Sequence, residues 1–543
     1  MASKILLLLL AVIVLIGCDS QSQSVSVDSV PIARISPEES IDSQIESFCG
    51  ACHGVPRPEN FPKDRWAEEI EQGYRLFFKS GRTDLRPVQP SSRVHEYYRQ
   101  YAPERLTITQ TPPFSSHDRS SGEPTSQEST EDTAWFLRRD FPILVEDEPL
   151  SISHICWLGD PSQQPSSAPD FESITPATKV SHEPALLACD MKRGHLVRVS
   201  LEDGTPSQTE FMGRFRNLAF AEPVDLDQDG RVDYLIADLG SFVPGDHSKG
   251  RVYWLHRDAG DQWEKTILLH RVGRVASLET GDFDADGQID ILVAEFGWRE
   301  TGNLHWLRNT TTDAGEPRFD AEIIDERSGA IQIQKCDLNA DGQLDFVTVL
   351  TQEHELVLAY LNDGRGHFTP QTIFAADYPS YGSSGIEQVD FDGDGDLDIL
   401  MTNGDAFDDY MLKPYFSIQW LENRGTYPYT HHHIADMQGV YRALPGDFDG
   451  DGDMDVIATA LLPKRIDNPT DFPLHSILLL EQDGVQFHRH VLETANSNHA
   501  TLEVADFNGD GRPDFATGEF WPDSKERTLS VWINRMQGYR TTQ

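Results

Sequence analysis

From about residue 136 to the C-terminus, the chain repeats a unit of short apolar strands separated by polar loops. Each unit has an apolar lead, an Asp-rich loop, a β-branched strand and a further strand centred on an aromatic residue. The loops begin at Asp225, Asp282, Asp337, Asp390, Asp447 and Asp506. A period of roughly 55 residues with four short strands per unit is typical of a β-propeller, because a single blade cannot bury its own faces. An earlier unit, Leu186 to Val199, has the strand pattern without the loop. We therefore expect a mainly β fold of seven blades, with six or eight as alternatives.

A helical pattern precedes these repeats. Three segments carry apolar residues at the spacing of one helix face, namely 41–48, 63–79 and 91–101. Gly81 follows the second segment as a stop signal, and Pro103 closes the third. Residues 107–135 are rich in Ser, Thr, Pro and Glu with little periodicity, which is typical of a linker. The pattern predicts a small α-helical domain at 41–106, then the linker, then a propeller at 136–543.

The N-terminus has the features of an export signal. Lys4 precedes an apolar run, Ile5–Ile16, which is too short to span a bilayer and suits the core of a signal peptide. The run ends in Leu-Ile-Gly-Cys, which resembles a bacterial lipobox, and the resemblance implies cleavage before Cys18 and acylation of its thiol. A plain signal peptide is the alternative. We expect a lipoprotein signal at 1–18, a tether at 19–40, and an exported protein anchored by lipid on the periplasmic or cell-surface side of a bacterial membrane.

Charge narrows the possible partners and cofactors. The chain has 89 acidic and 45 basic residues and a formal net charge of −44, which argues against a nucleic-acid-binding protein, because such a protein would show a basic face. Much of the acidity lies in short clusters. Carboxylates in such clusters repel one another unless a cation lies between them, so the composition indicates bound metal.

The six loops share the pattern D-x-[DN]-x-D-G-x-x-D. Side chains at positions 1, 3 and 5 converge if Gly at position 6 permits a sharp turn, and positions 7 and 9 offer a carbonyl and another carboxylate. This all-oxygen set suits Ca²⁺ better than Mg²⁺, and the strand that follows excludes a helix-flanked EF-hand. The candidate calcium ligands are Asp225, Asp227, Asp229 and Asp233; Asp282, Asp284, Asp286 and Asp290; Asp337, Asn339, Asp341 and Asp345; Asp390, Asp392, Asp394 and Asp398; Asp447, Asp449, Asp451 and Asp455; and Asp506, Asn508, Asp510 and Asp514.

The loops and their period resemble the FG-GAP or VCBS repeats of integrin-type β-propellers. The resemblance covers roughly residues 180–535 and recurs six times. It implies a calcium-binding propeller that holds up to six ions in a structural role, in which the metal stabilises the fold.

A second motif lies in the helical region, where Phe48 is followed by Cys-Gly-Ala-Cys-His. C-x-x-C-H is the attachment signature of c-type haem: Cys49 and Cys52 would form the thioethers and His53 would be the proximal iron ligand. A thioredoxin-type C-x-x-C needs a βαβ setting that is absent here, and a zinc site needs a further ligand. The segment resembles the small cytochrome c-like region that precedes VCBS propellers in some environmental bacteria.

The distal haem ligand is less defined. No Met lies between Met1 and Met191, so His95 on the third helical segment is the candidate, with His117 in the linker behind it. An ordinary surface role for His95 is the alternative.

Other cysteines and histidines give further expectations. An oxidising compartment would allow a disulfide between Cys156 and Cys189, although the sequence does not fix this pairing. Cys336 is expected to be a small buried residue. The run 431–433 holds three histidines on a predicted strand, where successive side chains face opposite sides, which disfavours a shared metal. Arg442 and His499 precede Asp loops and so are candidates for a site on the propeller axis.

The sequence contains no nucleophile elbow, phosphate-binding loop or dinucleotide fingerprint. We therefore favour an electron-transfer lipoprotein whose propeller docks a redox partner protein, an extracellular polymer or another ligand. One alternative is a non-enzymatic surface binding or adhesion propeller. Another is a haem-linked oxidoreductase that acts on a carbohydrate or similar substrate.

Overall fold

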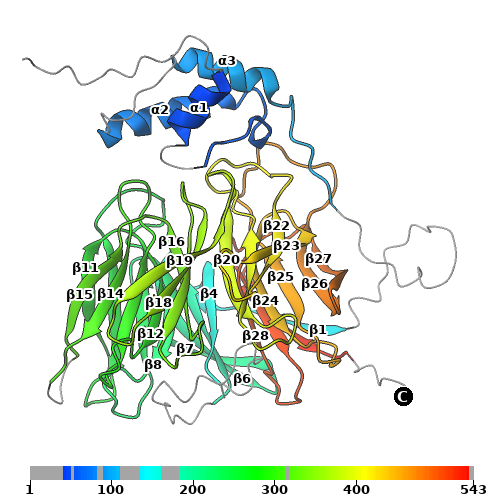
Figure 1. Cartoon of the computed structure of the whole chain (residues 1–543). Helices are drawn as coiled ribbons and strands as arrows, with labels where there is room; N and C mark the ends of the chain where they lie inside the picture. The colour runs from blue at the N-terminus through cyan, green and yellow to red at the C-terminus, as the bar shows by residue number, and fades with distance from the viewer. Residues whose placement is uncertain are drawn as a thin grey trace, which may run out of the picture.

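The computed structural model describes residues 41–50, 54–81, 90–110, 135–159, 183–312 and 317–536. Its main body contains seven four-stranded antiparallel sheets, each a blade of a β-propeller (Figure 1). The first strand of each blade contacts the first strands of its two neighbours, and these contacts run unbroken around the ring. The prediction of a seven-bladed propeller is confirmed.

The strands follow chain order from the axis outward in six blades and are set out here blade by blade. The first three blades are β4 (Ile152–Trp157), β5 (Ala185–Asp190), β6 (His195–Glu202) and β7 (Thr205–Arg214); β8 (Leu218–Val224), β9 (Asp233–Asp238), β10 (Gly250–Arg257) and β11 (Trp263–Val272); and β12 (Val275–Gly281), β13 (Asp290–Glu295), β14 (Asn303–Asn309) and β15 (Phe319–Asp325). The next three are β16 (Ala330–Cys336), β17 (Asp345–Leu350), β18 (Leu356–Asn362) and β19 (Phe368–Ala375); β20 (Ser383–Val389), β21 (Asp398–Asn403), β22 (Ser417–Glu422) and β23 (Thr430–Asp436); and β24 (Val440–Gly446), β25 (Asp455–Ala460), β26 (His475–Asp483) and β27 (Gln486–Thr494). The last blade is β28 (His499–Ala505), β29 (Asp514–Glu519), β30 (Leu529–Asn534) and β1 (Phe136–Phe141), and a short hairpin joins β2 (Leu144–Val145) to β3 (Glu148–Pro149).

The second strand of every blade is buried along its whole length. These strands lie between neighbouring blades, so both of their faces need apolar or internally bonded side chains, as in the sequence Asp-Ile-Leu-Val-Ala-Glu of β13. This arrangement explains why the β-branched run after each Asp loop is continuous instead of alternating.

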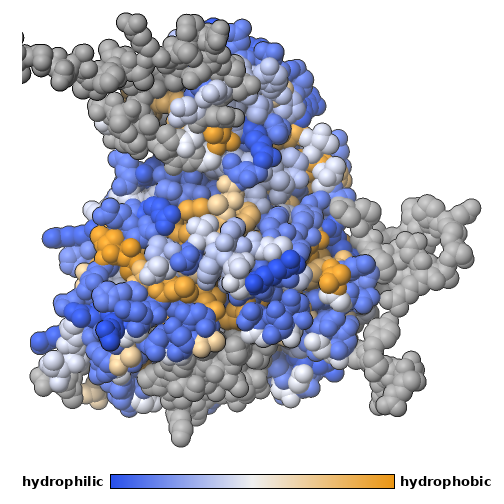
Figure 2. All heavy atoms as spheres, in the orientation of Figure 1, coloured by the Kyte–Doolittle hydropathy of each residue, from blue (hydrophilic) through white to orange (hydrophobic). Residues whose placement is uncertain are grey.

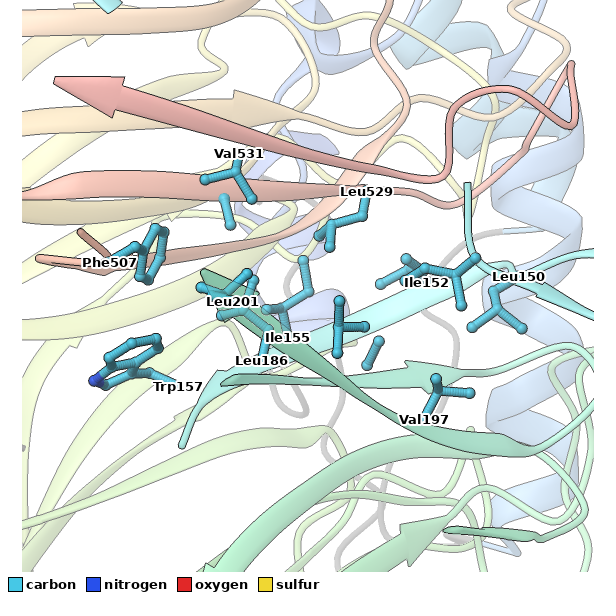
Figure 3. Close-up of a cluster of buried hydrophobic side chains, with 14 of the residues drawn as sticks. Leu150, Ile152, Ile155, Trp157, Leu186, Val197, Leu201, Phe507, Leu529 and Val531 are labelled. Atoms are coloured by element: carbon cyan, nitrogen blue, oxygen red, sulfur yellow. The ribbon is translucent and has the colours of Figure 1, made fainter. Parts of the chain in front are cut away.

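The ring is closed by the first strand of the chain. Strand β1 pairs antiparallel with β30, so both ends of the propeller sequence lie in one blade. The junction between the last and first blades is filled by apolar side chains that include Ile152, Trp157, Phe507 and Val531 (Figure 3). Burial of this surface stabilises closure, at about 25 cal/mol per Å² of apolar area.

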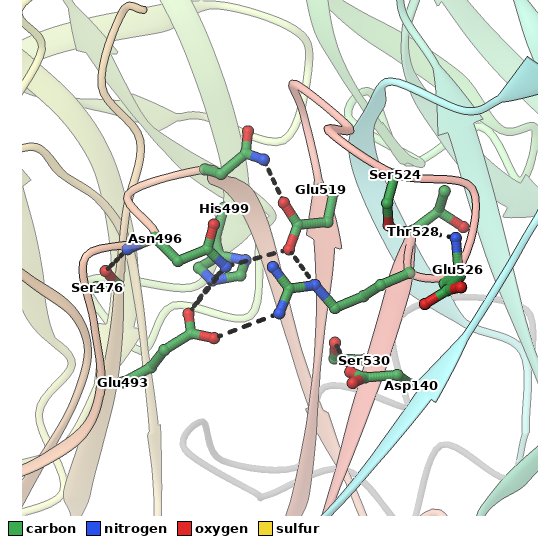
Figure 4. Close-up of polar contacts among 12 residues, drawn as sticks. Asp140, Ser476, Glu493, Asn496, His499, Glu519, Ser524, Glu526, Thr528 and Ser530 are labelled. Carbon is green, nitrogen blue, oxygen red and sulfur yellow. Dashed lines mark hydrogen bonds and ion pairs between the residues drawn. The ribbon is translucent and has the colours of Figure 1, made fainter.

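A charged network crosses the neighbouring junction, between the sixth blade and the last (Figure 4). Glu493 at the end of β27 accepts hydrogen bonds from Arg138 Nη1 of β1 at 2.6 Å and from His499 Nε2 of β28 at 2.6 Å. Arg527 pairs with Glu519 at 2.9 Å and lies 4.0 Å from Glu493. Burial opposes ionisation of Glu493, but the hydrogen bond from His499 and the charges of His499 and Arg138 outweigh it and lower its pKa to about 2. His499, a candidate for the axis, instead belongs to this network.

The three predicted helical segments are present as α1 (Ile41–Cys49), α2 (Trp66–Ser80) and α3 (Ser91–Tyr101), with a short 3₁₀ turn, η1 (Pro58–Asn60). Helix α2 begins three residues later than predicted, because residues 63–65 form a turn after Pro62. It ends at Gly81, whose φ of 65° is the left-handed conformation that glycine adopts without strain. Trp66 of α2 stacks on Tyr98 of α3 with ring centroids 3.8 Å apart, which forms the centre of the helical core.

The helices lie over one end of the propeller (Figure 1) and share part of their core with it. Met411, from the loop between β21 and β22, is 2% exposed and packs in the helical core. Lys413 of the same loop is fully buried: its Nζ bonds Asp409 at 2.6 Å and Asn60 O at 3.3 Å and lies 3.7 Å from the centroid of the Phe61 ring. The helices of the region predicted as a small α-helical domain at 41–106 thus pack as a layer against the propeller.

The outer surface is mainly hydrophilic in the view of Figure 2, with separate hydrophobic patches across the middle of the propeller. Among the residues that the structure describes, no helix is both long and apolar enough to cross a membrane.

Candidate metal sites

All six Asp-rich loops fold into one kind of turn. In the loop that begins at Asp282, the Asp282 carboxylate accepts a hydrogen bond from Gly287 N at 2.9 Å, and Asp286 accepts one from Gln288 N at 2.8 Å. Gly287 has a φ of 87°, which explains the glycine at position 6. The corresponding glycines of the other loops also have positive φ: Gly230, Gly342, Gly395, Gly452 and Gly511.

The Asp at position 9 is buried and connects its loop to the blade. Asp290 is 0% exposed. Its Oδ2 accepts a hydrogen bond from Phe283 N at 3.2 Å, and its Oδ1 accepts one from Asn309 N of the third strand at 2.7 Å. Burial raises the pKa of each of these carboxyls. The pKa is about 7 for Asp233, Asp290, Asp398 and Asp514, about 6 for Asp345 and about 8 for Asp455.

Carboxylate oxygens converge within the loops. In four loops, three carboxylates each offer an oxygen within 4.8 Å of the others, as Asp225/Asp227/Asp229, Asp282/Asp284/Asp290, Asp390/Asp392/Asp398 and Asp447/Asp449/Asp455. The remaining two loops carry an amide at position 3, and there Asn339 and Asn508 donate to the position-5 carboxylates at 3.0 and 3.1 Å. Oδ1 atoms of Asp225 and Asp284 are buried without a hydrogen-bond partner among the described residues. Orphaned, converging carboxylate oxygens fit a hard divalent cation such as Ca²⁺.

The raised pKa values of the position-9 carboxyls predict how the stability of the protein in excess chelator depends on pH. A folded-state pKa above the unfolded value means that the folded state binds more protons, so stability should fall as pH rises from about 4 to about 8. Each buried position-9 carboxyl should contribute on the order of a few kcal/mol across that window. Urea denaturation at several pH values measures the slope, and Asp290→Asn should reduce it. A chelated protein that becomes more stable toward pH 8 would contradict this explanation.

The loops and the helices lie at opposite ends of the propeller. Each Asp loop joins the first strand of a blade to the second, whereas the loops that hold Met411 and Asp467 against the helices join the second strand to the third. Because successive strands are antiparallel, these two sets of loops emerge from opposite ends. The Asp loops therefore lie at the end of the propeller that the helices do not cover.

The haem motif is described only in part. Cys49 ends α1 and is half-buried, whereas Cys52 and His53 lie outside the described residues, as does Cys18 of the predicted lipobox. Cys49 packs beside Tyr74, and a cluster of aromatic rings continues from there through Phe48 and Phe77 to Phe78, which is 70% exposed. An exposed aromatic cluster next to a thiol fits a covalently attached apolar macrocycle.

Two side chains are candidates for the distal position. His95 is half-buried on α3, as the sequence predicts. Met411 lies in the apolar cluster against which Cys49 packs. Sequence reasoning missed Met411 because it considered only the methionines close to the motif, while Met411 comes from a propeller loop.

The other predicted residues have structural roles. Cys156 and Cys189 are free thiols in the structure: the register of β4 and β5 places Cys156 opposite Leu187, so the disulfide that the sequence left open is not formed. Cys336 is fully buried at the end of β16, as expected. The three histidines at 431–433 bond separately to Gln419, Glu422 and Asp436, so they do not converge on a metal.

Polar side chains of the first strands bond from one blade to another near the propeller axis. Lys335 of β16 pairs with Glu279 of β12 at 2.9 Å, and Arg442 of β24 donates to Gln332 of β16 at 2.7 Å, two blades away. Burial, with the charge of Glu279, raises the pKa of the nearby Glu222 to about 7. The predicted position of Arg442 near the axis is confirmed.

The Asp-loop repeats match a known family of repeats. The FG-GAP-like repeat family matches residues 225–293 and 337–401, which include four of the six Asp loops. A crystal structure of BBS1N in complex with ARL6DN is similar at 9% sequence identity and a TM-score of 0.38, covering 66% of this chain and 89% of that one. A "putative 6-phosphogluconolactonase" from Bacteroides uniformis is similar at 12% identity and a TM-score of 0.40, covering 64% and 88%. Likeness at this level carries no information on function. No curated protein matches the chain.

Proposed function

Starting from FG-GAP-like repeats in a seven-bladed propeller, we propose that this protein is an exported, calcium-stabilised binding platform whose helical layer carries one c-type haem for electron transfer. The observation that carries the proposal is the joint packing of the two parts. The segment that bears the C-x-x-C-H motif is fastened to the propeller through Met411 and Lys413, so a redox group there would have a fixed position relative to any ligand of the propeller.

Calcium would be held by positions 1, 3, 5 and 9 of each loop, with a backbone carbonyl at position 7. Buried carboxyls with raised pKa values support this assignment, because a cation compensates the repulsion and desolvation that raise them. The role is structural: the ion fixes the loop between the first two strands of a blade. Six sites follow from six loops, and the first blade, which lacks the motif, would hold none.

Haem would be held by thioethers to Cys49 and Cys52, with His53 as the proximal ligand and His95 or Met411 as the distal one. Bound haem would supply one-electron redox chemistry. The aromatic side chains of Phe48, Tyr74, Phe77 and Phe78 would shield it from water on one side. A redox titration would report the distal ligand, since a His/His pair gives a lower potential than a Met/His pair.

Location follows from the N-terminal signal. Export would place the protein where c-type haem is attached, and acylation of Cys18 would anchor it to the membrane at the start of the tether, residues 19–40. The partner proposed for the propeller is a redox protein or an extracellular polymer that meets the outer surface. Net charge excludes nucleic acid as that partner.

The haem assignment is tested by a pyridine haemochrome spectrum of the full chain, expressed with its signal in a strain competent for cytochrome c maturation. We expect a c-type α-band in the wild type and complete loss of covalent haem in the Cys49→Ala, Cys52→Ala double variant. Cys336→Ala is the matched control, because this cysteine is buried in a blade far along the chain from the motif; it should retain haem. A folded wild type without haem would refute electron transfer and leave a non-enzymatic surface binding protein.

A further inference from the structure

Arg274 is a buried charge that has no ion-pair partner among the residues that the structure describes. It immediately precedes β12 on the helix-facing end of the propeller and is 7% exposed. Within the described part of the chain, no carboxylate lies within 4.0 Å of its guanidinium, and the guanidinium makes no hydrogen bond; Nε is shielded from water without an acceptor. Its one defined contact is with the ring of Phe296, 5.3 Å from Cζ. Burying a guanidinium without a counterion raises the free energy of the folded state, and buried arginines in proteins are normally paired with an anion.

Other arginines of the propeller follow the usual rule. Arg138 is held by Glu493 and Asp140, and Arg327 forms two-pronged hydrogen bonds with Asp325. Burial lowers the pKa of Arg274 to about 10, although the fields of Tyr441 and Asp408 oppose the shift. The group remains charged at neutral pH, and the residues that the structure describes place no carboxylate within ion-pair distance of it.

Residues around Arg274 come from several blades. Tyr441 is the second residue of β24, and Asp405 and Asp408 lie in the loop between β21 and β22. Tyr441 and Asp408 nevertheless interact electrostatically with Arg274, which belongs to the third blade. Electrostatic interaction between residues of separate blades is expected close to the axis, where the first strands surround the central channel, so we place this group at the helix-facing mouth of that channel. Phe407 and Tyr441 belong to a half-buried apolar cluster at that end.

We propose that Arg274 is the anion-binding residue of a ligand site at the helix-facing mouth of the channel, and that the ligand is a small organic carboxylate. A planar guanidinium presents parallel N–H donors that match the two oxygens of a carboxylate. The apolar part of the ligand would lie against Phe296, Phe407 and Tyr441. This assignment deepens the binding role proposed above and rests on it, but its test requires neither haem nor a change in calcium.

Acidic neighbours favour a monoanion over a phosphate dianion. Asp405 and Asp408 stand at the same mouth, and burial, with repulsion between neighbouring acids, raises their pKa values to about 7 and about 6. A protonated Asp405 can donate a hydrogen bond to a ligand carboxylate, whereas two ionised acids would repel a doubly charged ligand.

The test combines stability and binding in the calcium-loaded full chain. Arg274→Met removes an unpaired charge while keeping volume, so its melting temperature should equal or exceed that of the wild type. Arg138→Met is the matched control: it removes a paired arginine and should lower the melting temperature by several degrees. Calorimetric titration with sodium acetate, sodium succinate and sodium D-glucuronate should show binding to the wild type by at least one of them and at least tenfold weaker binding to Arg274→Met. D-glucose and sodium sulfate serve as uncharged and dianionic controls.

Several outcomes would overturn the assignment. If Arg274→Met is destabilised as much as Arg138→Met, then the arginine has a structural role. If a carboxylate binds equally well to the variant, or if sulfate alone binds, the proposed site or its ligand class is wrong. If none of the three carboxylates binds the wild type at millimolar concentration, the proposal fails.

Discussion

Removing calcium is expected to lower the melting temperature of the protein by on the order of 10–20 °C. A single ion at about 100 times its dissociation constant stabilises a fold by about 2.7 kcal/mol, and six loops share the same turn. The physical cause is the set of converging carboxylates with orphaned oxygens, together with buried position-9 carboxyls that carry a desolvation penalty without metal. Scanning calorimetry in excess EDTA, followed by return of calcium, measures the effect.

Two controls sharpen this experiment. Magnesium should restore little of the lost stability, because it demands a tighter geometry and releases its water reluctantly. Asp282→Ala should reduce the calcium stoichiometry by one, whereas Asp523→Ala, which removes an exposed carboxylate outside the loops, should leave it unchanged. A melting curve that is identical with and without EDTA would rule out structural calcium.

Replacing Glu493 by Ala should destabilise the calcium-loaded protein by about 3–5 kcal/mol. This carboxylate is 11% exposed and accepts hydrogen bonds from Arg138 and His499, so its loss leaves those groups buried without their partner across the junction between the sixth blade and the last. Denaturation by urea measures the change. Glu300→Gln is the control: Glu300 forms an exposed pair with Lys79, and its loss should cost less than about 1 kcal/mol.

Acid should weaken the same network. Because the pKa of Glu493 in the folded state, about 2, lies below its ordinary value of 4.5, the stabilisation is present above pH 4.5 and is lost as pH falls toward 2. Glu493→Gln should flatten that part of the curve. A variant as stable as the wild type at neutral pH would show that the network contributes nothing to closure.

The repeated part of the fold was predictable because its signals are local. Each Asp loop specifies its own turn through glycine at position 6, and the run that follows Asp290 is continuously apolar because β13 is buried on both faces. Helices α2 and α3 could be placed for the same reason, since Gly81 and the apolar spacing act within a few residues.

Features that depend on contacts between distant parts of the chain could not be predicted from local sequence signals. Nothing in the composition of β1 indicates that it pairs with β30, and nothing near Lys413 indicates that its ammonium group bonds to Asn60. The lack of a partner for Arg274 is likewise a property of the assembled blades. The sequence could not show whether Cys156 and Cys189 form a disulfide, because that depends on the pairing of β4 with β5. The register of these strands places neither cysteine opposite the other.

Closure of the ring by β1 has a consequence for how the protein is made. Asp140 on β1 accepts a hydrogen bond from Ser530 on β30 at 2.7 Å, and the two residues are 390 positions apart in the chain. Strand β1 is therefore synthesised early but cannot pair until β30 has also been synthesised. Until then the nascent chain exposes an unpaired edge, and such long-range pairing makes folding slow and dependent on protection from aggregation. A premature stop codon only a few residues before Leu529 would therefore leave an open ring with an unsatisfied first strand, a species suited to degradation instead of partial function.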